Sequence, residues 1–66
     1  MSVAKVVEIT SSSKKSFEEA IRKGVKKTSE TVQGIQGIWV KEQKCVVQDG
    51  EIVEFRVDMK LTFIVK

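Results

Sequence analysis

Apolar and polar residues alternate most regularly in the last third of the chain. Between residues 53 and 65 every second position is apolar, and charged or hydroxyl residues fill most of the positions between them. This period of two predicts a β-strand with one buried face. A β-branched run at residues 3–9 predicts a first strand, and the polar residues 10–13 predict a turn after it.

The middle of the chain has a helical period instead. From Phe17 to Ile35 the apolar residues recur at spacings of three and four, and most lysines lie off this stripe. The pattern predicts one amphipathic helix over residues 14–33. Gly34 follows directly and is a typical helix stop.

The residues at the start of this helix match a capping box. Ser16 is followed three positions later by Glu19. In such a box the serine hydroxyl accepts a hydrogen bond from the amide of the third helical residue, and the glutamate reaches back to the serine amide. Ser13 is the alternative N-cap.

Asp49-Gly50 predicts a tight turn between a second and a third strand, because a type I′ turn needs positive φ at both central positions. The second strand then opens near Gly37. The predicted fold class is α+β: a three-stranded antiparallel sheet in the order β-α-β-β, with one long amphipathic helix packed on one face. With a two-residue turn, facing residues have numbers that add up to 99. A three-residue loop with a bulge would shift this pairing.

This register assigns each pair of residues to one face of the sheet. The pairs on the helix side are Val46–Val53, Glu42–Val57, Val40–Met59 and Ile38–Leu61. The pairs on the other side are Cys45–Glu54, Gln43–Arg56, Lys41–Asp58 and Trp39–Lys60. Most of this second set joins complementary polar or charged groups, which supports the register.

Trp39 is the only tryptophan, and the alternation places it on the face away from the helix. One helix does not cover both faces of a three-stranded sheet, so the indole is exposed in a monomer, beside Cys45, Val47 and Ile52. An exposed tryptophan in an apolar patch is typical of a subunit contact or a ligand platform, and the alternation disfavours a core position. Lys60, opposite, is placed to lie over the ring as a cation–π partner.

Composition excludes several kinds of catalytic and metal site. The chain has no histidine and a single cysteine, Cys45. Histidine-based acid–base catalysis, Ser-His-Asp and Cys-His nucleophiles, and zinc sites of histidine or several thiolates are therefore excluded. The pattern indicates no enzyme. Calcium needs several oxygen ligands, and Glu42, Glu54 and Asp58 are available without forming a calcium-loop motif.

Length and charge limit the number of domains and the kinds of partner that the chain is expected to have. Residues 1–66 are predicted to form a single domain, whose small core favours oligomerisation. The net charge is +3, and glutamates are interleaved with the helix lysines, so a solvated helix face is expected rather than nucleic-acid binding. No run is long enough to span a membrane and no signal peptide is visible, which predicts a cytoplasmic protein.

The chain resembles the dodecin family of small βαββ proteins over nearly all of its length. The resemblance rests on the opening KVVEITSSSKKSFEEAI, on TSETVQGI at the end of the helix, on VKEQ in the second strand and on FRVDMKLTF in the third. It implies a hollow homododecamer that stores a small ligand without catalysis. In the flavin-binding type, stacked pairs of riboflavin, FMN or FAD lie at subunit contacts.

The resemblance also identifies candidate ligand-binding residues. The family's stacking tryptophan falls on Gly37 here, and its flavin-binding glutamine falls on Arg56. Trp39 is two residues beyond the stacking position on the same strand face, so a displaced stack is one hypothesis. The alternative is a flavin-free assembly, because Val-Lys-Glu-Gln resembles a branch without the flavin tryptophan, and one member of that branch is described as calcium-binding.

Overall fold

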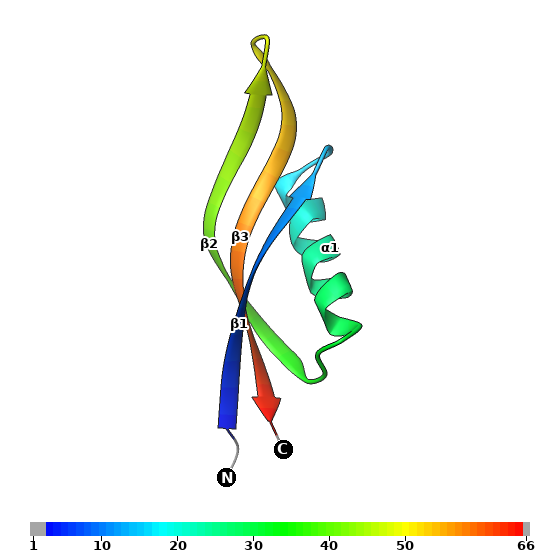
Figure 1. Ribbon diagram of the computed structural model, residues 1–66, viewed down its shortest axis with the longest axis vertical. Coiled ribbons are helices and arrows are strands. Elements are labelled where there is room, and N and C mark those ends of the chain that lie inside the picture. The colour runs from blue at the N-terminus through cyan, green and yellow to red at the C-terminus, as the bar shows by residue number, and fades with distance from the viewer. Residues whose placement is uncertain (1–2, 66) are drawn as a thin grey trace.

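A computed structural model describes residues 3–65 and shows one layer of sheet with one helix against it (Figure 1). Its elements are β1 (Val3–Ser13), α1 (Phe17–Ser29), β2 (Ile35–Gln48) and β3 (Glu51–Val65). The sheet is antiparallel with the order β1-β3-β2, so the last strand is central. The predicted α+β class and element order are confirmed.

The first strand is longer than its sequence predicts. Residues 10–13 were expected to form a turn, but they continue β1, where Thr10 pairs with Asp58 and Ser13 with Phe55. Pairing with the central strand satisfies their backbone groups and overrides their weak strand propensity. Ser13 itself is buried, and its hydroxyl accepts a hydrogen bond from the Lys15 amide at 2.9 Å, so the turn begins only there.

The helix is shorter than the predicted 14–33. It begins at Phe17, and Ser16 is its N-cap, as predicted, with Oγ accepting from the Glu19 amide at 3.0 Å. The Glu19 carboxylate accepts from the Ser13 hydroxyl at 2.9 Å, so both candidate serines take part in the helix start.

The predicted C-terminal end of the helix is wrong by one turn, because the chain must turn back early to enter β2. Gly34 adopts φ +80°, and its carbonyl accepts from the Ile64 amide at 3.2 Å. This hydrogen bond fixes the entry to β2 beside β3, and β2 therefore opens at Ile35, before the expected Gly37. Residues 30–34 form the connecting turn.

The core lies between α1 and the two strands β1 and β3. Its fully buried members are Ala20, Val57, Met59 and Leu61. At the N-terminal end of α1, the Phe17 and Phe55 rings meet edge to face with centroids 5.1 Å apart. The alternation that predicted the helix side of β3 is therefore confirmed, and among residues 3–65 no helix covers the opposite sheet face.

The predicted hairpin register is right at two places and wrong between them. The pairs Trp39–Lys60, Val40–Met59 and Ile38–Leu61 are as predicted. Two irregularities, one between Val46 and Val47 and one between Val40 and Glu42, shift the intervening pairs by one residue. The observed pairs there are Glu42–Asp58, Gln43–Val57, Lys44–Arg56, Cys45–Phe55 and Val46–Glu54.

The shift changes which β2 side chains share a face with the helix. The pairs predicted as Val46–Val53, Glu42–Val57, Cys45–Glu54, Gln43–Arg56 and Lys41–Asp58 do not form. Because directly opposed residues point to the same side, Cys45 lies on the helix side with Phe55 rather than beside Trp39. A β-bulge places one extra residue in one of two paired strands. Here Val53 is the extra residue on β3 and Lys41 the extra residue on β2, so the second bulge restores the register that the first one shifted.

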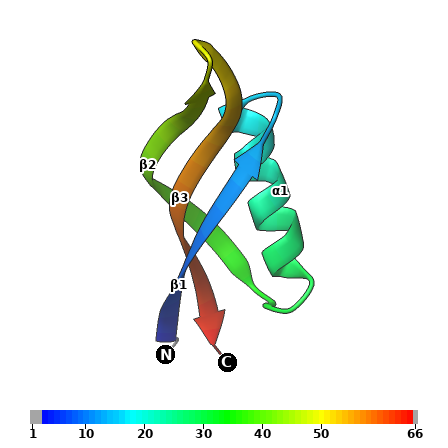
Figure 2. The same cartoon turned by 45° about the horizontal axis from the view of Figure 1, so that its top comes forward.

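The β2–β3 hairpin is longer than the part of it that α1 covers. In both views the hairpin tip lies beyond the loop that joins β1 to α1 (Figures 1 and 2). Asp49 and Gly50 have φ values of 52° and 78°, as the predicted tight turn requires. The molecule is accordingly elongated, with principal extents of 52 × 19 × 13 Å.

Candidate functional site

The sheet face opposite the helix carries the candidate ligand residues. Along β3 it presents Glu54, Arg56, Asp58, Lys60 and Thr62, the positions between the buried ones. Trp39 stands on β2 directly opposite Lys60 and is 65% exposed. The Lys60 ammonium lies 5.4 Å from the centroid of the indole ring. The predicted exposure of Trp39 and its cation–π partner are both confirmed.

Gly37 lies two residues before Trp39 and on the same face, opposite Thr62. The Thr62 hydroxyl donates to the Gly37 carbonyl at 3.4 Å. A Cβ added at Gly37 would lie 3.1 Å from Thr62 Oγ1, so even a small side chain would press on that hydroxyl. The position supplies no aromatic plane.

Arg56 lies on the same face, between Ser12 on β1 and Lys44 on β2. Its Nε donates to Glu54 Oε1 at 2.9 Å. This hydrogen bond from Arg56, with a smaller contribution from Ser12, lowers the pKa of the Glu54 carboxyl below its usual range. The guanidinium is thus held by a carboxylate while its side chain stays 42% exposed.

The structure does not bring Arg56 next to Trp39 within one chain. Arg56 and Lys60, the residue opposite the indole, are four positions apart on β3, which corresponds to about 13 Å at the usual rise of a strand. Gly37 and Trp39 therefore lie together on β2, and Arg56 lies on a separate part of the same face.

A polar cluster that sequence reasoning missed lies between these two parts. Lys41 Nζ lies 3.0 Å from Glu8 Oε2, although β3 separates their strands. The Thr10 hydroxyl donates to Asp58 Oδ1 at 2.8 Å in the same area. The hydrogen bond to Glu8 raises the pKa of Lys41. The sequence does not indicate the pairing of Lys41 with Glu8, because Lys41 owes its position to the bulge between Val40 and Glu42.

Carboxylates on this face do not gather into an evident metal site. Glu42 faces Asp58 across the strands, but Glu54 lies nearer the hairpin turn with Arg56. Among residues 3–65 no group of three or more acidic or cysteine side chains is placed to hold a metal ion. In the same part of the chain, no helix has the length and apolar character that crossing a membrane requires.

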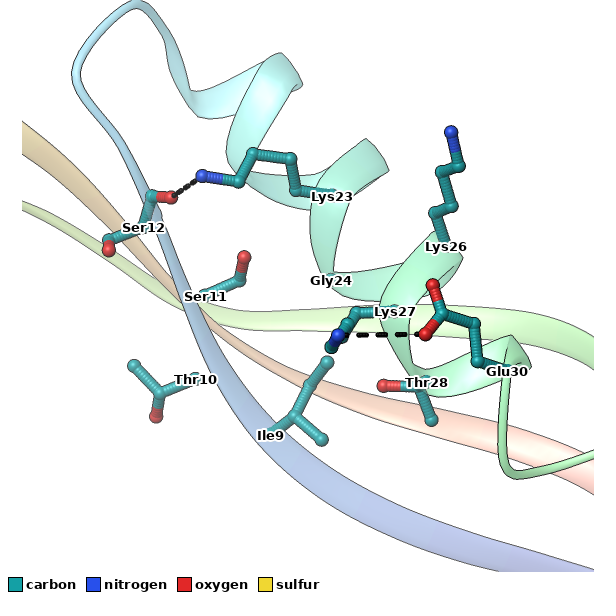
Figure 3. Close-up of a pocket in the computed structure, with 10 residues that line it drawn as sticks. All are labelled: Ile9, Thr10, Ser11, Ser12, Lys23, Gly24, Lys26, Lys27, Thr28 and Glu30. Atoms are coloured by element: carbon teal, nitrogen blue, oxygen red, sulfur yellow. Dashed lines mark hydrogen bonds and ion pairs between the residues drawn. The ribbon is translucent and has the colours of Figure 1, made fainter.

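A concave region lies beside the helix, between α1 and the free edge of β1 (Figure 3). Its volume is ≈ 580 Å³, and it is lined by Ile9, Thr10, Ser11, Ser12, Lys23, Gly24, Lys26, Lys27, Thr28 and Glu30. Three of these residues are lysines from one side of α1. We call this region the lysine groove.

Comparison with protein families gives one match, the Dodecin family, which covers residues 3–66. The chain belongs to the Dodecin family. A comparison with curated proteins found no match. Dodecin from Streptomyces davaonensis is 28% identical, with a TM-score of 0.93 over 98% of this chain and 96% of that one.

Two further dodecins are similar in structure. Calcium dodecin from Mycobacterium tuberculosis, described as a calcium-chelating immunodominant antigen, is 29% identical with a TM-score of 0.84, over 97% of this chain and 91% of that one. Dodecin from Streptomyces coelicolor has a TM-score of 0.94 over 98% of this chain and 93% of that one, and at 23% identity it shows the dodecin fold alone. The likeness extends over nearly the whole of both chains in each comparison.

Proposed function

We propose that this dodecin is a non-enzymatic, cytoplasmic subunit of a homododecameric shell that binds a planar or anionic small molecule at contacts between copies. The observation that carries the proposal is the 65% exposure of Trp39 on a sheet face that no element within residues 3–65 covers. An indole buries about 150–250 Å² when it is covered. A domain of this size has little other apolar surface to contribute to its stability.

The neighbourhood of Trp39 supports a planar ligand at that contact. Gly37 brings no side chain to the strand face beside the indole, and Lys60 places a positive charge above the ring. The flavins FMN, riboflavin and FAD combine a planar ring with, in two of them, phosphate. Arg56 suits the anionic part, because a guanidinium binds phosphate or carboxylate with two parallel hydrogen bonds. We propose Gly37, Trp39 and Arg56 as the ligand-contacting residues.

The experiment is a titration of FMN and riboflavin into the purified assembly, followed by quenching of flavin fluorescence, with the mass of each variant measured by light scattering. Trp39→Ala should weaken the binding of both ligands, because it removes the planar surface. The assembly should persist, because other exposed apolar side chains such as Val47 and Ile52 remain for contacts between copies. Arg56→Met should weaken FMN binding and spare riboflavin binding, because of these two ligands only FMN carries phosphate. Ile38→Ala, one residue away on the opposite face, is the matched control.

Two results would contradict the ligand part of the proposal. One is an unquenched flavin with both wild type and Gly37→Trp, which places an aromatic ring at residue 37. The other is a Trp39→Ala variant that falls apart into smaller species, which would assign the indole to the subunit contact itself. A monomeric or dimeric wild-type protein at micromolar concentration would overturn the shell.

The second candidate is a flavin-free shell that binds a divalent cation. It is favoured by the 29% identity to the calcium dodecin of M. tuberculosis and by the Glu42–Asp58 pair on the exposed face. Calorimetric titration with Ca²⁺ tests it. Heat that disappears in Asp58→Asn, with no flavin quenching in the wild type, would favour this candidate over the first.

A further inference from the structure

The end of the β2–β3 hairpin is an apolar projection without cover. We call residues 47–53 the hairpin arm. Val47 and Ile52 oppose each other in the register and are 58% and 56% exposed, and Val53 in the bulge is 37% exposed. The edge-to-face contact of Phe17 with Phe55 is at the N-terminal end of α1, so the arm lies past the surface that the helix covers (Figure 1).

The charge of the arm is entirely negative. Asp49 and Glu51 flank the turn glycine, and residues 45–53 contain no lysine or arginine. Neither carboxylate has an ion partner within residues 3–65. The arm therefore combines exposed apolar side chains with two unpaired negative charges at its tip.

The lysine groove has the opposite character. Lys23 Nζ donates to the Ser12 carbonyl at 3.2 Å, on the free edge of β1, and Lys27 Nζ lies 3.5 Å from Glu30 Oε1. Lys26 has no carboxylate partner in the described part of the chain and stands away from the helix in Figure 3. Between the lysines and β1 the floor of the groove is Ile9 and the backbone of Gly24, which is buried closely against the sheet.

We propose that the hairpin arm of one copy lies in the lysine groove of a neighbouring copy. Asp49 and Glu51 would then face Lys23 and Lys26, while Val47 and Ile52 cover the apolar floor at Ile9. The proposal rests on the assembly argued above and names one of its contacts. Because arm and groove are different surfaces, the contact is head-to-tail, and such contacts generate closed assemblies when the rotation between copies closes.

The apolar part of the arm distinguishes this occupant from a small anion. A free phosphate in the groove would neutralise the lysines but leave Val47, Ile52 and Val53 in water. A second copy covers both surfaces in one step. Complementary charge across a contact steers the association and sets its register, whereas the apolar area supplies most of the stabilisation.

Charge reversal on each side, and then on both, tests the contact. The arm variant is Asp49→Asn with Glu51→Lys, since asparagine tolerates the positive φ at position 49. The groove variant is Lys23→Glu with Lys26→Glu. Each should raise the protein concentration at which the assembly half-dissociates by roughly tenfold or more, and a chain carrying all four changes should recover most of that loss. Analytical ultracentrifugation measures the mass over a dilution series, and circular dichroism checks that each variant is folded.

The matched control is Lys14→Glu with Lys15→Glu, which makes the same change of charge before the same helix but outside the groove. It should assemble as the wild type does. Should the helix with reversed charges unfold, Lys23→Gln with Lys26→Gln replaces that variant, with the same expected direction and a smaller effect.

Arm and groove variants that assemble at wild-type concentrations would overturn the contact while leaving the shell intact. A groove variant that keeps its mass but loses binding of inorganic phosphate would also overturn it and assign the groove to an anion. A wild-type protein that never assembles would overturn both the shell and this contact.

Discussion

Lys41 reaches from β2 across the central strand to Glu8 on β1, with the ammonium 3.0 Å from the carboxylate. The two strands are not neighbours, so this ion pair joins the two edges of the sheet over the top of β3. It depends on the bulge between Val40 and Glu42, which takes Lys41 out of the strand register.

The first prediction concerns this pair. Lys41→Met and Glu8→Gln should each lower the urea midpoint of unfolding slightly, and the double variant should lose no more than either single one, because both remove the same interaction. Both side chains are partly in water, so the effect should shrink as salt is raised to about 1 M, where the Debye length is only about 3 Å. Equal effects at low and high salt would show that packing rather than charge is responsible.

The second prediction concerns the two faces of β3. Leu61→Ala should destabilise the fold by about 2–5 kcal/mol, because it empties a fully buried position under the helix. Glu54→Ala, on the exposed face, should have a small effect on unfolding of the subunit. Chemical denaturation of both variants measures the difference, and the reverse order would overturn the assignment of faces and with it the location of Trp39.

The third prediction concerns the close approach of helix and sheet at Gly24. A Cβ there would lie 2.5 Å from Met59 Cε and 3.0 Å from Ser11 Cβ. Gly24→Ala should therefore lower stability by about 1–3 kcal/mol through overpacking, less the roughly 1 kcal/mol that alanine contributes as a better helix former. Met59→Leu removes the nearest methyl group and should make Gly24→Ala less harmful. A more stable Gly24→Ala variant in an otherwise unchanged chain would show that the helix retreats at little cost.

The fourth prediction concerns acid. The hydrogen bond from Arg56 lowers the folded-state pKa of Glu54 below its ordinary value of 4.5. A carboxyl with a depressed folded pKa stabilises the fold fully above its unfolded pKa, and this contribution is lost as the pH falls through the folded value. The urea midpoint should thus drop below pH 4.5, and Arg56→Gln should reduce the drop. A pH profile of unfolding for wild type and Arg56→Gln is the measurement, with Arg22→Gln, whose partner Glu18 is on the exposed helix surface, as the control.

Local patterns in the sequence were enough to predict the helix, the strands and the sheet face that packs against the helix. The period of two in β3 identified the side that takes the helix, and Val57, Met59 and Leu61 are fully buried as it predicts. The capping serine and the Asp49-Gly50 turn were equally local, because each depends on the backbone conformation of a few consecutive residues. The exposure of Trp39 followed from the same alternation.

The features that the sequence did not determine depend on contacts between strands that are far apart in the chain. The polar residues 10–13 became strand because β3 offers them partners, and helix α1 ended early because Gly34 bonds to Ile64. The two bulges changed the face of Cys45 and released Lys41 toward Glu8, and an inserted residue has no signature in hydrophobic periodicity. The lysine groove likewise exists only because α1 lies beside the free edge of β1, where lysines that read as a solvated face surround a concave surface. Periodicity is a property of neighbouring residues, whereas register and concavity are set by the packing of whole elements.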